Sequence, residues 1–258
     1  MMTNYPAIKE NITAFIRHKV QEAGAIGAVI GLSGGIDSAL TAYLSVEALG
    51  ADKVLGLLLP EKGITTEQDI DDAMEVARLL DIEHKTIDIS KVLISFSSTI
   101  PDFNKNNLLA CGNLKARTRM CILYYHANVM YRMVVGTGNK TELLLGYFTK
   151  YGDGGVDIEP IGCLYKTQVR GLSRHMGVPA CIIEKTPTAG LWPGQTDEAE
   201  LGVTYEAADG ILAMLVDEKK DILEVKKKFP ASQVDRLVSL IKANEHKKLA
   251  PPSPGFLF

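Results

Sequence analysis

A carboxylate stands inside a glycine-rich turn of the kind that binds phosphate. Residues 33–38 read Ser-Gly-Gly-Ile-Asp-Ser, after the apolar run 28–32 and before a helix-like stretch at 39–49. A strand, a glycine turn and a helix N-terminus in this order present unpaired backbone N–H groups, and these together with the helix dipole favour an anion. The carboxylate of Asp37 would repel phosphate unless a cation lay between them. The motif therefore predicts a magnesium ion between Asp37 and a polyphosphate.

Two better-known glycine-rich signatures do not fit this turn. A Walker loop needs a lysine where this chain has Ile36 and Asp37. The dinucleotide fingerprint fails because Gly31 and the pair Gly34 and Gly35 have the wrong spacing. The motif resembles instead the SGGxDS loop of the ATP pyrophosphatase (PP-loop) superfamily, whose members split ATP into AMP and pyrophosphate. The alternative is an ordinary glycine-serine turn between a strand and a helix, which the added Asp-Ser disfavours.

Composition narrows the class of protein. The chain has 258 residues, and its 28 basic residues nearly balance 31 acidic ones, so its charge gives no sign of nucleic-acid binding. No apolar run approaches the ~20 residues of a membrane span, and no basic region with an apolar core opens the sequence, so we expect no signal peptide. The four cysteines form neither a C-x-x-C pair nor a zinc-type cluster. We expect a cytoplasmic protein with reduced, buried thiols and no nucleic-acid or membrane partner.

The order of the elements predicts an α/β fold. Strand-like apolar runs alternate with helical periodicity, and short connections favour a right-handed, parallel sheet. The expected strands are residues 28–32, 54–59, 83–89 and 133–136. The expected helices are residues 8–20, 39–49, 65–80, 110–131, 165–176, 198–216, 218–228 and 231–247. We predict a doubly wound parallel sheet of about five strands with helices on both faces, in a single domain that spans residues 1–258.

Three loops are richer in glycine and polar residues than a plain connection. Residues 136–142 form a second glycine loop after a strand, where an open α/β sheet places the other wall of its ligand crevice. Residues 146–157 are too rich in glycine for a helix. Residues 185–197 include two prolines and the single tryptophan, Trp192, and loops of this length in compact domains are usually functional or disordered.

Five separated stretches of this chain resemble ammonia-dependent NAD synthetases, and together they cover nearly all of it. They are SGGIDS at 33–38, GNLKARTRM at 112–120, GTGNKTE at 136–142, FTKYGDGGVD at 148–157 and PTAGLWPGQTDEAELG at 187–202. The resemblance implies a Rossmann-like fold of the adenine nucleotide alpha hydrolase type. It also implies a ligase that uses ATP to adenylate the nicotinate carboxylate of deamido-NAD, releases pyrophosphate, and lets ammonia displace AMP to give NAD.

The resemblance also implies roles for particular residues. Those expected to bind ATP are Gly31, Leu32, Ser33, Gly34, Gly35, Ile36, Asp37, Ser38, Thr137, Lys166 and Thr188. Those expected to bind deamido-NAD are Arg117, Lys150, Asp157, His246 and Lys247. Asp37 and Glu142 would hold magnesium, and Asp37, Lys150 and Lys166 would be the catalytic residues. The family builds the deamido-NAD site across a two-fold interface, so we expect a homodimer.

Two places depart from the family pattern. Many relatives carry an arginine where this chain has Leu58, so a polar contact to ATP there would be lost or replaced. The second loop reads GTGNKTE, where other relatives have GTDHAAE, so the roles of Asn139 and Lys140 stay open. The chain is also too short to contain a glutaminase domain beside this one, which favours free ammonia as the nitrogen source.

Two other functions fit parts of the sequence. Another PP-loop enzyme, such as a tRNA-modifying thiolase or lysidine synthetase, would need a basic surface for tRNA, and the thiolases usually need a cysteine pair; the sequence offers neither. A nucleotide-binding sensor without catalysis would be favoured by the loss of a metal ligand, yet Asp37 and Glu142 are both present.

Overall fold

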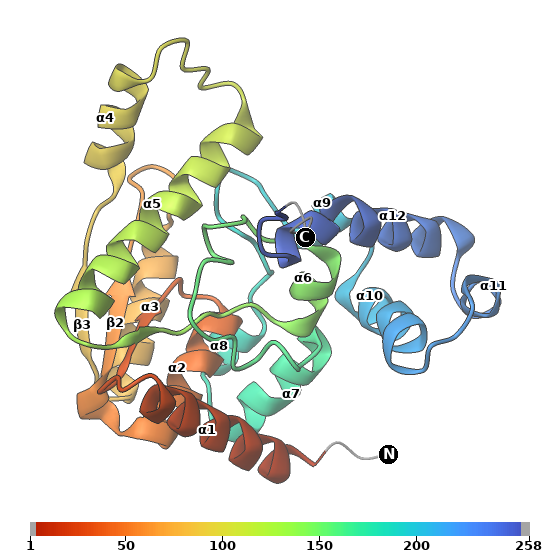
Figure 1. Cartoon of the computed structure of the whole chain (residues 1–258), viewed down its shortest axis with the longest axis horizontal. Helices are drawn as coiled ribbons and strands as arrows, with labels where there is room; N and C mark the ends of the chain where they lie inside the picture. The colour runs from red at the N-terminus through yellow and green to blue at the C-terminus, as the bar shows by residue number, and fades with distance from the viewer. Residues whose placement is uncertain (1–3, 254–258) are drawn as a thin grey trace, which may run out of the picture.

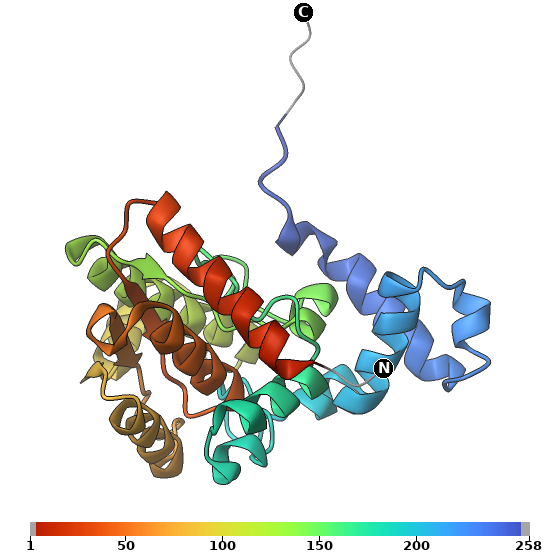
Figure 2. The ribbon, with the colours of Figure 1, turned by 90° about the horizontal axis from the view of Figure 1, so that it is seen from below.

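The computed structural model describes residues 4–253. Residues 1–3 and 254–258 lie outside the described residues, and so do the first positions on which the signal-peptide expectation depends. The described chain is an α/β structure in which helices cover a central parallel sheet (Figures 1 and 2). The predicted fold class is confirmed. The expectation of buried thiols was wrong, because Cys121, Cys163 and Cys181 are exposed and Cys111 is half-buried. Among the described residues, no helix combines the length and apolar character that crossing a membrane requires.

Four parallel strands form the sheet, in the spatial order β3-β2-β1-β4. Their bounds are β1 Ala28–Gly31, β2 Val54–Leu58, β3 Glu83–Thr86 and β4 Met133–Val134. Ala28 of β1 pairs with Val54 on one side and with Met133 on the other. Because these strands are parallel and in register, the loops that follow β1, β2 and β4 all leave from one edge of the sheet.

The prediction of about five strands was wrong by one. Beside β4, where a fifth strand would lie, a single parallel bridge joins Val135 to Ile158. The segment that makes this bridge is short because Gly155 precedes it and Pro160 follows it, and proline has no N–H with which to continue a ladder. The strand expected at 83–89 is also shorter, ending at Thr86.

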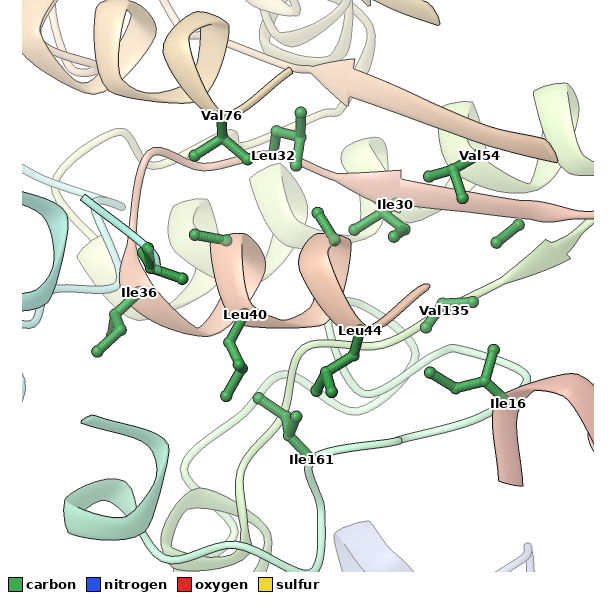
Figure 3. Packing of buried hydrophobic residues seen from close by; sticks show 14 of the residues in the cluster. Ile16, Ile30, Leu32, Ile36, Leu40, Leu44, Val54, Val76, Val135 and Ile161 are labelled. Atoms are coloured by element: carbon green, nitrogen blue, oxygen red, sulfur yellow. The ribbon is translucent and has the colours of Figure 1, made fainter. Parts of the chain in front are cut away.

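Both faces of the sheet are buried. In β2, Val54 and Leu58 face one apolar cluster and Leu55 and Leu57 face another, and all four side chains are at most 1% exposed. This is the pattern that a continuous apolar run predicts for a central parallel strand. Figure 3 shows part of the first cluster, to which β1, α2 and α1 contribute.

Helices form a layer on each face. On the first face lie α2 Ile36–Leu49 and α3 Glu67–Leu79, with α1 Tyr5–Glu22 and α7 Lys166–Met176 packed against α2. On the second face lies α5 Leu108–Val129, with α4 Ser90–Thr99 beside its N-terminal half (Figure 1). Thr66 caps α3 and forms a capping box with Asp69, so this helix begins at Glu67, two residues later than the sequence predicts.

The remaining helices follow the sheet in the chain. They are α6 Lys140–Leu145, α8 Ala180–Ile183, α9 Asp197–Leu201, α10 Tyr205–Leu212, α11 Ile222–Val225 and α12 Ala231–Lys248. A π-helix at Ala213–Asp217 follows α10, and a 3-10 helix at Ala51–Lys53 precedes β2. Helices α10 to α12 lie to one side of the sheet (Figure 1) and bury a separate apolar cluster, to which Leu145 of α6 and Leu201 of α9 also belong.

Two helix predictions in this region were wrong. The helix expected at 198–216 is interrupted after Leu201 by Gly202, which has a φ of 77°, and it continues as α10. The helix expected at 218–228 is reduced to α11, because Lys219 takes a left-handed backbone and Asp221 caps the new start. A local charge and leucine pattern cannot distinguish these short pieces from one long helix.

Candidate active site

A cavity of about 470 Å³ opens at the carboxyl edge of the sheet. The loops after β1, β2 and β4 form its floor, while α5 and the loop 185–197 supply its sides. This is the position at which open α/β sheets bind their ligands. The loop 185–197, whose length predicts a functional or a disordered segment, borders this cavity.

The glycine turn after β1 forms one end of the cavity. Helix α2 begins at Ile36, three residues earlier than the sequence predicts, so Asp37 stands in its first turn. Gly34 has a φ of 75°, and a Cβ there would lie 2.2 Å from the backbone oxygen of Asp69. Only glycine can hold this conformation and let the turn pack against the start of α3.

The two serine hydroxyls of the turn brace its backbone. Ser33 Oγ lies 3.0 Å from Ser38 Oγ and accepts the N–H of Gly35 at 3.2 Å. Ser38 Oγ donates to the carbonyl of Gly35 at 2.9 Å and accepts the N–H of Ser33 at 3.2 Å. These bonds fix the curvature of the turn, so the positions of its N–H groups are set before any anion arrives.

The second glycine loop joins the first through Asn139. The amide Nδ2 of Asn139 donates to Asp37 Oδ1 at 3.0 Å, while its Oδ1 accepts the N–H of Glu142 at 3.0 Å and so caps α6. The carboxylate of Glu142 in turn accepts the N–H of Asn139, which completes a capping box. Asn139, left without a role by the sequence, thus positions both carboxylates. Lys140 points elsewhere and pairs with Asp217 at 2.6 Å.

Lys166 brings a buried positive charge to these carboxylates. Its side chain is 2% exposed, and its Nζ lies 2.5 Å from Asp37 Oδ2 and 3.5 Å from Glu142 Oε1. Burial alone would lower the pKa of Lys166, but the charges of Asp37 and Glu142 outweigh it and hold this pKa above its usual range. Burial, with the nearby charge of Asp37, raises the pKa of Glu142. Three segments far apart in sequence therefore meet in one polar centre.

The donor set of this centre fits magnesium. Asp37 and Glu142 offer carboxylate oxygens, and their side chains are 18% and 17% exposed. An ammonium group already lies against both of them, which shows that the pair attracts a cation. Within residues 4–253, no three His, Cys, Asp or Glu side chains are grouped to bind a metal ion. Two carboxylates alone suit Mg²⁺, which completes its shell with water and phosphate oxygens.

Other residues expected to bind ATP also line the cavity. Every residue of the turn at 31–38 except Gly34 lines the cavity, and Thr137 and Lys166 line it as well. Thr188 lines it as well, although its hydroxyl donates to the carbonyl of Gln195 at 2.8 Å and so stabilises the loop 185–197. The structure therefore brings nearly all of this predicted group together.

Of the five residues expected to bind deamido-NAD, one lines the cavity. Lys247 lines the cavity, and its Nζ donates to the carbonyls of Gly146 and Phe148 at 2.8 and 3.0 Å. Lys150 lies outside the cavity lining and donates to the carbonyls of His246 and Leu249 at the end of α12.

The remaining members of this group lie farther from the cavity. Arg117 is exposed and donates to the carbonyl of Lys150, so it adjoins the lysine on the outer surface. The carboxylate of Asp157 accepts from the hydroxyl of Tyr124 at 2.9 Å and from the N–H of Val134 at 2.7 Å. Arg117, Lys150, Asp157 and His246 do not line the cavity.

Sequence reasoning missed several charged residues of the site. Lys185 lines the cavity and pairs with Asp69 and Asp72, both at 2.6 Å, which ties the loop 185–197 to α3. Arg119 also lines it, and its Nε donates to the carbonyl of Leu59 at 3.0 Å. Arg119 follows Arg117 by two residues within one motif, and helical periodicity alone could have separated an inward from an outward side chain.

Comparison with known proteins decides the family. Residues 8–251 match the family model described as NAD synthase. The chain belongs to the NAD synthase family. An NH(3)-dependent NAD(+) synthetase from Methanosarcina acetivorans is 52% identical over 253 residues, which cover 97% of this chain and 98% of that protein. The resemblance inferred from five sequence stretches is thereby confirmed.

Solved structures of NAD synthase relatives share the fold. The NMN synthetase of Francisella tularensis is 37% identical, with a TM-score of 0.88 over 98% of this chain and all of that one. An NH3-dependent NAD synthetase from Campylobacter jejuni, solved with a nitrate ion, is 31% identical, with a TM-score of 0.83 over 98% of this chain and all of that one. The family match therefore extends over both sequence and structure.

Proposed function

We propose that this protein amidates deamido-NAD to NAD with ammonia and ATP, releasing AMP and pyrophosphate. One observation carries the proposal. Asp37, Glu142 and Lys166 come from three separate segments and meet beside the glycine turn, at one end of a cavity. A carboxylate pair for a metal, a buried ammonium and an anion-binding turn are the groups that transfer of an adenylyl group needs. Membership in the NAD synthase family supports the same reaction.

The reaction needs ATP because a carboxylate is a poor acyl donor. A carboxylate oxygen of the nicotinate attacks the α-phosphorus of ATP, and the bond from that phosphorus to the β-phosphate bridging oxygen breaks, so pyrophosphate leaves. The nitrogen of ammonia then attacks the carbonyl carbon, the bond to the AMP oxygen breaks, and a proton passes from nitrogen to solvent. Little side-chain acid–base chemistry is required, so the enzyme contributes mainly placement and charge.

The roles of the residues follow from their positions. The turn at 31–38 and Thr137 would bind the phosphates, and Lys166 would contact them from the buried side of the site. Asp37 and Glu142 would hold magnesium, which when bound neutralises phosphate charge as pyrophosphate departs. Thr188 would contact ATP from the loop 185–197.

We further propose that a homodimer completes the acceptor site. Arg117, Lys150 and His246 cluster outside the cavity, where they would bind deamido-NAD only if another surface closed over them. Helix α5, which carries Arg117, also exposes apolar side chains such as Tyr125 and Val129, at 66% and 61%. Asp157 would bind the same substrate. A cytoplasmic location belongs to this proposal through the family resemblance, and cell fractionation would test it.

The experiment is an assay of AMP and pyrophosphate formation. The purified protein is incubated with ATP, magnesium and deamido-NAD, with ammonium or glutamine as nitrogen source. We expect AMP, pyrophosphate and NAD in equal amounts, with ammonium supporting the reaction far better than glutamine. Release of ADP, or AMP release that does not depend on the pyridine nucleotide, would contradict the proposal.

A second acceptor is a candidate because one solved relative is an NMN synthetase, 37% identical to this chain. Nicotinate mononucleotide has the same reacting carboxylate as deamido-NAD but lacks the adenylyl half. The same assay with each acceptor compares their kcat/KM values. We expect deamido-NAD to be preferred, because the relatives about 50% identical are NAD(+) synthetases. A higher kcat/KM for nicotinate mononucleotide would reassign the substrate.

A further inference from the structure

Lys166 lies against the ring of a buried tyrosine. Its Nζ is 5.0 Å from the ring centroid of Tyr205, whose side chain is fully buried. An ammonium group over an aromatic face is attracted by the negative charge of the π-system, and the attraction grows when both are removed from water. The ammonium therefore has Asp37 and Glu142 on one side and this ring on another.

Tyr205 is held in place by Asp197. The hydroxyl of Tyr205 donates to Asp197 Oδ2 at 2.8 Å, and Asp197 is 4% exposed. Asp197 is fixed in turn, since its backbone N–H donates to the carbonyl of Pro187 at 3.1 Å. A tyrosine has two rotatable side-chain bonds, so anchoring its hydroxyl as well as its Cα leaves the ring no freedom to turn.

Asp197 belongs to a hydrogen-bonded network that reaches across the cavity wall. The hydroxyl of Tyr147 lies 3.3 Å from Asp197 Oδ1 and 2.6 Å from Glu200 Oε2. Glu200 accepts from the side-chain amide of Gln195 at 3.2 Å, and Gln195 accepts the N–H of Leu191 at 2.8 Å. The loop 185–197 and the glycine-rich stretch 146–157 are thus both tied to the residue that holds Tyr205.

We propose that Tyr205 and Asp197 are positioning residues for Lys166. The ring of Tyr205 fixes where the ammonium lies, and Asp197 fixes the ring. The pair also supplies favourable surroundings for the ammonium that do not depend on Asp37 and Glu142. This matters when those two carboxylates bind a divalent cation, because their attraction for the lysine is then largely neutralised. The buried ammonium must then be stabilised by another group.

The proposal deepens the proposed function, because it assumes that Lys166 contacts ATP in the reaction. The test compares Tyr205→Phe, which keeps the ring and removes the hydroxyl, with Tyr205→Leu, which removes both. We expect kcat to fall about tenfold in the first variant, since small misplacements of an active group cost up to about a hundredfold. We expect a larger fall in the second. The KM for ammonium should not change in either.

A matched control is available in the same chain. Tyr165 also lies beneath a lysine, with Lys140 Nζ 4.4 Å from its ring centroid, and its hydroxyl donates to Asp217 at 2.9 Å. Its ring does not line the cavity. Tyr165→Phe should lower the unfolding temperature about as much as Tyr205→Phe while leaving kcat close to that of the wild type. Equal losses of kcat in the two variants would show a general effect of stability and overturn the proposal.

The double variant tests whether the two residues act as one unit. Asp197→Asn should lower kcat by a similar factor to Tyr205→Phe, and combining them should add little, because residues in one network are not additive. Multiplicative losses would mean that Asp197 does not act through Tyr205. If Asp197→Asn does not fold, the comparison of Tyr205→Phe with Tyr165→Phe still decides the matter.

Lys166→Met separates this inference from the proposed function. Severe loss of AMP formation in Lys166→Met, with normal kcat in Tyr205→Phe, would overturn the positioning role alone. Normal activity in Lys166→Met would overturn the assigned role of the lysine itself. We expect severe loss in Lys166→Met and partial loss in Tyr205→Phe. The fluorescence-monitored affinity of each variant for ATP without magnesium gives a second readout, which should weaken in Lys166→Met.

Discussion

The side-chain amide of Asn139 donates to the carboxylate of Asp37 at 3.0 Å, and 102 positions separate the two residues in the chain. This bond joins the glycine turn after β1 to the glycine loop after β4. Since Asn139 also caps the helix that carries Glu142, one asparagine sets the relative position of two carboxylates. The arrangement explains how a loop that departs from the family pattern can still form the site.

Two substitutions at Asn139 separate its two tasks. Asn139→Ser keeps a side-chain oxygen for capping α6 but removes the amide that bonds to Asp37, whereas Asn139→Ala removes both. Chemical unfolding should show that Asn139→Ala is about 1 kcal/mol less stable than Asn139→Ser, the usual worth of an N-cap. AMP formation should fall in both variants, because both remove the hydrogen bond to Asp37 Oδ1 and leave only Lys166 to position this carboxylate. Full activity in Asn139→Ser would show that the bond to Asp37 is dispensable.

Asp37→Asn tests the magnesium assignment. An amide has no charge to offer a divalent cation, so AMP formation should fall at least about a hundredfold, in the range seen when a single positioned charge-stabilising group is removed. Asp71→Asn makes the same chemical change on an exposed position of α3 and serves as the control. The measurements are activity against magnesium concentration and the magnesium-dependent shift of the unfolding temperature. Wild-type responses in Asp37→Asn would contradict the assignment.

Local patterns predicted the parts of this structure that local physics determines. The glycine turn at 33–38, the buried strand β2 and the presence of α3 depend on neighbouring residues, so their positions could be predicted to within about three residues from spacing and residue type. The predictions that were wrong concern features that spacing and residue type do not determine. The break at Gly202 depends on this glycine taking a left-handed backbone, and the missing fifth strand depends on how far a short segment pairs with its neighbour. Sequence spacing reveals neither.

Local sequence patterns could not predict the contacts between segments that are distant in the chain. Lys166 was assigned to the site only by family resemblance, and no local sequence pattern predicted that the ring of Tyr205 would lie against it. Asp197 stood within a quoted motif yet received no role, because its hydroxyl partner comes from the following helix. An isolated lysine, aspartate or tyrosine is ordinary in any sequence, and burial beside opposite charge becomes visible only in three dimensions.

Glu159 should make stability depend on pH. Its carboxylate Oε2 accepts the N–H of Gly138 at 2.9 Å beneath the second glycine loop. Burial raises the pKa of Glu159 to about 8, although the bond from Gly138 opposes this, against 4.5 for an unperturbed glutamate. The folded state therefore binds this proton more tightly than the unfolded state does, and its contribution to stability is full below pH 4.5 and is lost as the pH rises through 8.

Glu159→Gln removes this titration and keeps an acceptor for the N–H of Gly138. The variant should gain stability relative to the wild type between pH 5 and pH 9, by an amount on the order of a few kcal/mol at most. Glu67→Gln, which changes an exposed glutamate on α3, should show no such gain. Chemical unfolding of all three proteins at several pH values gives the comparison. Parallel pH profiles for the wild type and Glu159→Gln would mean that Glu159 is not held protonated in the folded state.

Val129→Glu should separate the proposed dimer. Val129 is 61% exposed on α5, and a buried charge without a partner would weaken an interface that covers it. Leu223→Glu places the same charge on α11, where the leucine is 69% exposed, and should leave the assembly unchanged. Light scattering should then give a dimer for the wild type and Leu223→Glu and a monomer for Val129→Glu.

Because Arg117 lies on the same helix, the monomer should show a raised KM for deamido-NAD with an unchanged affinity for ATP. A wild type that is monomeric at micromolar concentration, or a Val129→Glu monomer with an unchanged KM, would place the acceptor site within one chain.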